Sequence, residues 1–74
     1  MTALDAREAI RNAMNAGQIT DNQLVAYQQA MFNRWHTPGT RVGHTLNLVE
    51  IALAKAIQAG VVQAYIANPL RFSF

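Results

Sequence analysis

The feature that most constrains this chain is the apolar pattern between Thr40 and Asn68. Apolar side chains recur there at alternating steps of three and four residues, a spacing that places them on one face of an α-helix. We therefore predict one long helix over Thr40–Asn68, with Thr40 as the preferred N-cap. Its first apolar stripe consists of Val42, Leu46, Val49, Leu53, Ala56, Gly60, Ala64 and Ala67.

The same predicted helix carries a second apolar set on another side. Such a helix would be about 42 Å long, roughly twice the length of any other helix in the chain, so one short helical hairpin cannot cover both faces. We predict that the second face is an interface with copies of this chain or with other subunits. The second set is Leu48, Ile51, Ala52, Ala59, Val62 and Ile66. The alternative is a break at Gly60, since glycine inside a helix costs ~1 kcal/mol; it would give a four-helix monomer.

Two shorter helices are predicted before the long one. The first runs from Ala3 to about Ala16, with a capping box from Thr2 and Asp5, and Gly17 supplies its C-cap. We expect this first helix to form a hairpin or corner with the second helix described below, because the connection between the two is short.

The second helix has the strongest start signal in the chain. Thr20 and Gln23 form a Thr-x-x-Gln capping box. The helix should end near Trp35 or His36, since Pro38 disfavours helical geometry at the residue before it. The predicted fold is therefore all-α, with a helical hairpin packed on a long third helix.

An apolar tail follows this single helical domain, which we place at residues 1–68. Pro69 stops the helix, and Leu70, Phe72 and Phe74 then alternate with Arg71 and Ser73. This alternation predicts an extended segment over residues 69–74 with its apolar side chains on one surface. Two interpretations stay open, since the tail could fold back on its own core or dock into a neighbouring chain.

Composition favours burial against other proteins. The chain has 74 residues, of which 51% are hydrophobic and 14% charged, against roughly 25% charged in an ordinary soluble domain. A domain this small is only marginally stabilised by its own core, and the absence of cysteine excludes disulfides. The two histidines, His36 and His44, are too few for a zinc site. Oligomerisation is the remaining means of stabilisation, and no cofactor or metal is predicted.

Charge and hydropathy also argue against several partners and locations. The net charge of +2 comes with no cluster of lysine and arginine, so nucleic-acid binding is not indicated. The longest uncharged stretch, Ala56–Leu70, is too short for a membrane span. Charged residues from Asp5 to Arg11 interrupt any signal peptide. We predict a location in the cytoplasm or within a virion.

No residues are predicted to be catalytic. Asp5 and Glu8 form the closest carboxylate pair, but helix capping and the helix dipole explain both of them. Ser73, the only serine, lies in the tail. We therefore predict that the protein is not an enzyme.

One segment could hold a ligand. It gathers polar and aromatic residues around the start of the long helix, where free N–H groups favour an anion. The candidate residues are Arg34, Trp35, His36, Thr40, Arg41 and His44. The alternative is a polar loop in which Trp35 joins the core and the arginines are solvated.

Taken together, these patterns predict a small, non-enzymatic assembly or adaptor subunit of a homo-oligomeric or multi-protein particle. A bacteriophage virion is one setting where short helical chains are common. Its interface would combine the second face of the long helix with Leu70, Phe72 and Phe74. The runner-up is an inhibitor or sequestering protein that binds a nucleotide, a phosphate or a host protein through the Arg34–Arg41 loop.

Overall fold

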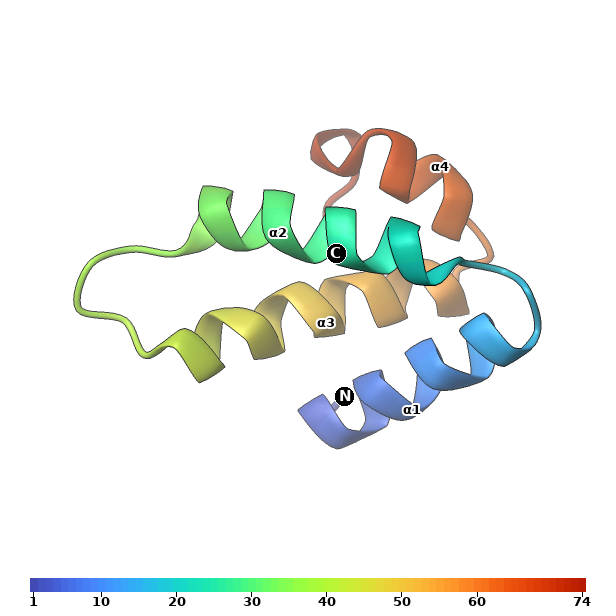
Figure 1. Cartoon of the computed structure of the whole chain (residues 1–74), viewed down its shortest axis with the longest axis horizontal. Helices are drawn as coiled ribbons and strands as arrows, with labels where there is room; N and C mark the ends of the chain where they lie inside the picture. Colours follow the sequence, from blue (N-terminus) through green and yellow to red (C-terminus); the bar gives the residue numbers. More distant parts are fainter.

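The computed structural model describes the whole chain, Met1–Phe74, as an all-α fold without β-strands. Four α-helices are followed by one 3-10 turn (Figure 1). The helices are α1 (Ala3–Asn15), α2 (Asp21–Trp35), α3 (Val42–Gln58) and α4 (Val62–Ala67), and the 3-10 turn η1 covers Pro69–Arg71. The predicted all-α class, with two helices packed on a third, is confirmed.

Capping boxes fix the starts of α1 and α2, as predicted. The Thr2 hydroxyl accepts a hydrogen bond from the Asp5 N–H at 3.1 Å, and the Asp5 carboxylate accepts one from the Thr2 N–H at 3.3 Å. Thr20 and Gln23 repeat this arrangement with two hydrogen bonds of 3.1 Å. Each box satisfies N–H groups that the first helical turn leaves without partners, so the side chains themselves define where the helices begin.

The predicted cap of α3 is wrong by one residue. Arg41, rather than Thr40, occupies the N-cap position, and no side chain caps this helix. The Thr40 hydroxyl lies 2.7 Å from the Thr37 hydroxyl instead. The two threonines therefore close the loop between α2 and α3 and leave the start of α3 open.

The prediction of one helix through Asn68 is also wrong, because the chain breaks at Gly60. Gly60 has a φ of +75°, a left-handed conformation that residues with a Cβ rarely adopt. Its N–H donates to the Ile57 carbonyl and the Val61 N–H donates to the Ala56 carbonyl, both at 3.0 Å. This is a Schellman motif, which satisfies the last carbonyls of α3 and reverses the chain. The short helix α4 then returns toward α2.

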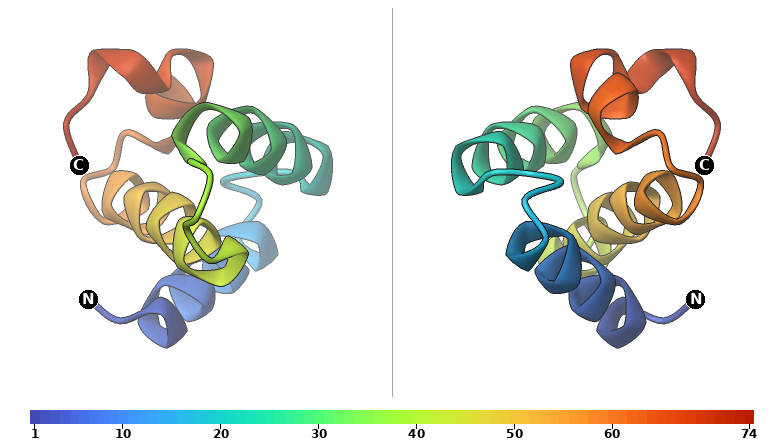
Figure 2. Two further views of the ribbon diagram at one scale, coloured as in Figure 1. Left: turned by 90° about the vertical axis from the view of Figure 1, so that its left-hand side faces the viewer. Right: turned by 90° about the vertical axis from the view of Figure 1, so that its right-hand side faces the viewer.

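α1 and α2 pack on different sides of α3 and touch each other far less (Figures 1 and 2). On one side, Arg7 of α1 donates to Glu50 at 3.3 Å and to Asn47 at 3.0 Å. At the other end of the chain, α4 is held to the start of α2, where the Gln23 amide donates to Gln63 at 2.9 Å. The predicted hairpin is therefore splayed around α3 rather than closed on itself.

The core is continuous across the four helices but short of large side chains. Five of the 13 buried hydrophobic residues are alanines: Ala6, Ala13, Ala52, Ala54 and Ala56. Leu53, Val49 and Tyr65 are the largest fully buried apolar or aromatic residues. Small side chains let the helices approach closely, but they bury little apolar area and so contribute little stabilisation each.

The tail folds back onto the molecule and is only partly extended. η1 occupies its first half, and Phe72 then takes an extended conformation. The rings of Phe72 and Phe74 both lie edge-on to Tyr65, with centroid distances of 5.9 and 5.3 Å. These contacts match the fold-back interpretation for the two phenylalanines, whereas Leu70 is exposed.

Candidate functional site

The most deeply buried polar arrangement joins Tyr27 of α2 to Tyr65 of α4. The Tyr27 hydroxyl donates to the Val49 carbonyl at 2.9 Å and lies 2.8 Å from the Tyr65 hydroxyl. Since Tyr27 has one proton to give, Tyr65 is the donor in the shared hydrogen bond. Burial raises the pKa of both phenols, because ionisation would place a charge in the core. The pair ties α2, α3 and α4 together as neutral hydroxyls.

The acidic side chains form no candidate metal site in the structure. No group of three or more histidine, cysteine, aspartate or glutamate residues is placed to hold a metal ion. Asp5 belongs to the capping box of α1, and Glu50 pairs with Arg7. Both therefore have structural partners within the chain.

The six residues of the candidate anion site do not converge on one pocket. Arg34 lines a depression between α2 and α4, together with residues such as Ile66 and Leu70. Arg41 and His44 line a different, entirely polar depression at the start of α3. Thr40 is engaged with Thr37, and Trp35 is exposed rather than placed in the core. The two arginines therefore face separate surfaces.

His36 has a structural role in this loop. Its Nδ1 lies 2.9 Å from the hydroxyl of Thr45, which is the one buried polar residue of the chain. The imidazole also stacks on Phe32, with a centroid distance of 4.6 Å and an interplanar angle of 15°. These contacts attach the end of α2 to the first turns of α3 and satisfy the Thr45 hydroxyl.

The nine residues predicted as an interface are divided by the break at Gly60. Ala52 and Val62 are buried in the chain's own core, and Ile66 and Phe72 pack against it. Ile51 is partly buried. The remaining four are exposed: Leu48, Ala59, Leu70 and Phe74. The turn at Gly60 therefore covers within the chain part of the surface that a continuous helix would have presented to neighbours.

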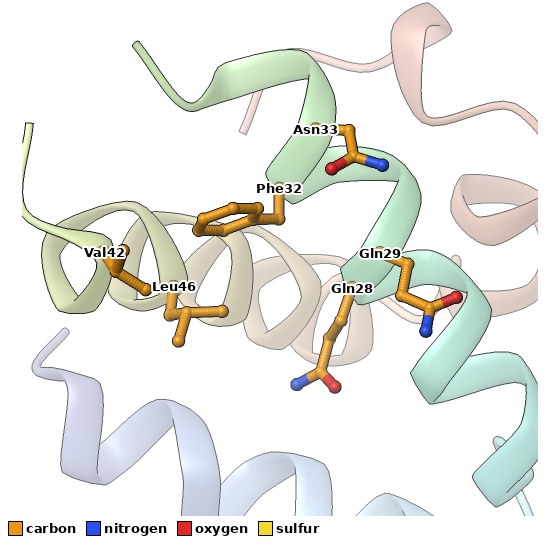
Figure 3. Close-up of a pocket in the computed structure, with 6 residues that line it drawn as sticks. All are labelled: Gln28, Gln29, Phe32, Asn33, Val42 and Leu46. Carbon is orange, nitrogen blue, oxygen red and sulfur yellow. The ribbon is translucent and has the colours of Figure 1, made fainter. Parts of the chain in front are cut away.

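A further apolar feature lies elsewhere, between the second half of α2 and the first half of α3. We call it the α2–α3 groove; it has a volume of about 510 Å³. Its lining residues are Gln28, Gln29, Phe32 and Asn33 from α2, and Val42 and Leu46 from α3. Figure 3 shows the Phe32 ring extending from α2 over the first turns of α3, beside Val42 and Leu46. Three apolar side chains thus form its floor, and three amides form its α2 edge.

Sequence reasoning missed this groove although it identified two of its residues. Val42 and Leu46 were assigned to the stripe that the chain's own hairpin covers, yet they are 55% and 36% exposed. The structure leaves them open because α1 contacts α3 around Asn47 and Glu50, beyond these first turns. No local pattern marks the groove, because Val42 and Leu46 follow the same apolar spacing as the buried Val49 and Leu53.

Comparisons of the chain with protein-family models, curated proteins and solved structures give no significant match. In addition, no helix of the fold has the length and apolar character needed to cross a bilayer.

Proposed function

We propose that this chain is a small, non-enzymatic assembly subunit that associates with copies of itself, and so builds or joins a larger protein particle. The observation that carries the proposal is the apolar side of the first turns of α3 that the chain itself leaves exposed. Val42 and Leu46 are exposed there, beside the half-buried Phe32 of α2. Isolated exposed leucines are ordinary, but a contiguous apolar surface is typical of interaction sites.

This exposure does not come from a loose fold. The chain has an accessible surface of 4815 Å², close to the roughly 4,500 Å² expected for a compact monomer of its mass. The chain is therefore compact, yet large apolar side chains lie outside while alanines fill much of the core. Association would bury those side chains and add stabilisation that the core alone does not supply.

The geometry favours this proposal over the sequestering alternative. A nucleotide or phosphate site at the Arg34–Arg41 loop would need both arginines to face one ligand, and they line different depressions.

The proposal is tested by measuring the molar mass in solution across the micromolar to millimolar range with sedimentation equilibrium. We expect the average mass to rise with concentration, and the melting temperature to rise with it, because association stabilises the folded state by mass action. A chain that stays monomeric, with a melting temperature independent of concentration, would contradict the proposal.

A further inference from the structure

The geometry points to the α2–α3 groove as a two-fold interface in which the groove of one copy packs against the same groove of a second copy. This inference rests on the proposed function and specifies its contact surface. In a two-fold dimer each side presents the same patch, so residues near the axis meet their own counterparts. The lining of the groove is suited to that constraint in two ways.

The first is charge. None of the six lining residues is charged, although the chain as a whole carries +2. A charged side chain near a two-fold axis would meet a like charge at close range, whereas an uncharged lining brings two copies together without that repulsion. Arg41 lines the separate depression with His44, and the charged residues Arg7, Arg11 and Glu50 border the other side of Gln28.

The second is hydrogen bonding. A side-chain amide carries both donors and an acceptor, so it can bond to the same amide of a second copy. Gln28, Gln29 and Asn33 place three such groups along one edge of the groove (Figure 3). The chain already shows this pairing internally, where Gln23 and Gln63 each donate to the other at 2.9 and 3.1 Å.

The apolar floor supplies the attraction. Phe32 is half-buried, and Val42 and Leu46 rise beside it from α3. A stable interface usually buries about 800 Å² on each partner, a sixth of this chain's total surface, and the groove alone is smaller than that. We therefore expect a weak, reversible dimer rather than a permanent one.

The test is sedimentation velocity on the full chain with Val42→Glu, and separately Val42→Lys. Val42 is the first residue of α3, where glutamate interacts favourably with the helix dipole, so the fold should persist. Either variant alone should raise the dissociation constant at least tenfold through repulsion between the two copies. An equimolar mixture of the two should recover association, because opposite charges then face each other across the axis.

Leu48→Glu is the matched control, since Leu48 is similarly exposed on the same half of α3 but does not line the groove. It should dimerise like the wild type. If Leu48→Glu loses association while Val42→Glu keeps it, the groove is not the interface. If both Val42 variants lose association and their mixture does not recover it, the two-fold geometry is wrong. Either result leaves the proposed function standing. Only a wild type that never associates would contradict both the proposed function and this interface.

Discussion

The two halves of α3 follow one apolar periodicity but meet different surroundings. From the middle of the helix onward, Val49, Leu53 and Ala56 are fully buried beneath α1, α2 and α4. In the first half, Val42 and Leu46 continue the same stripe and remain exposed. The cause is length: α3 has 17 residues and spans about 25 Å, while α1 has 13 and α4 only six. Periodicity identifies the apolar face of a helix, but the neighbouring elements decide how much of that face is covered.

The largest expected contrast between the halves comes from truncating one leucine in each. Leu53→Ala should lower the free energy of unfolding by about 3 kcal/mol, because it opens a cavity in a fully buried site. Leu46→Ala should cost about 1 kcal/mol or less, since its side chain is already partly in water. Urea denaturation at low protein concentration, where association does not contribute, measures both. Equal costs would show that the two halves are covered alike.

The next prediction concerns the hydrogen bonds that join Tyr27, Tyr65 and the Val49 carbonyl of α3. Tyr27→Phe removes the hydroxyl that bonds to Val49 and deprives the buried Tyr65 hydroxyl of its partner, so it should cost about 1–2 kcal/mol. Tyr65→Phe should cost less, because Tyr27 keeps its bond to the Val49 carbonyl. The difference between the two unfolding free energies measures how much of the link depends on Tyr27.

The same pair predicts a pH dependence. Burial raises the pKa of both phenols above their ordinary value of 10.0, so above that pH the unfolded chain loses protons that the folded chain retains. The stability from this pair is therefore complete below pH 10 and falls as the pH rises further. The decline should be weaker in Tyr27→Phe. An identical alkaline decline in the variant would mean that other groups cause it.

A smaller effect on stability tests whether the tail packs on the core of its own chain. Phe72→Ala should lower stability by about 1–2 kcal/mol, since it removes an edge-on contact with Tyr65 and a stacked contact with Phe74 at 5.6 Å. Phe74→Ala should cost less because Phe74 is more exposed. Neither variant should change the dissociation constant. A loss of association without a loss of stability would instead place the tail between chains.

The sequence predicted the bounds of α1 and α2 well, but it predicted neither the cap and end of α3 nor the coverage of its faces. The capping boxes of Thr2 and Thr20 are local, because each involves residues three apart, so pattern alone identifies them. The α2–α3 groove is not local, since it depends on where α1 stops along α3. The prediction of the anion site failed for a similar reason: Arg34 and Arg41, seven residues apart in the sequence, line different depressions on either side of the loop.

The break at Gly60 was predictable in principle, because the chain uses the same device twice. Ala16-Gly17-Gln18 and Ala59-Gly60-Val61 both end a helix with a glycine at positive φ, +74° and +75°. In both, the residue after glycine donates to a carbonyl five positions back. Gly17 is recognisable as a helix end because the capping box of Thr20 and Gln23 starts a new helix shortly after it, whereas apolar residues directly after Gly60 conceal the second instance.

Because the two glycines are equivalent, substituting them gives the smallest expected change in stability and the most closely matched comparison. Gly60→Ala and Gly17→Ala should each lower stability by about 1 kcal/mol, because alanine is strained at positive φ although open space surrounds both sites. Gly43→Ala serves as the control of opposite sign. Gly43 lies within the exposed first turn of α3 with nothing near it, so alanine should raise stability by a few tenths of a kcal/mol. If Gly60→Ala were also stabilising, α3 would tolerate continuation through residue 60. α4 would then no longer return to cover the second half of α3, and the surface predicted along one long helix would be accessible.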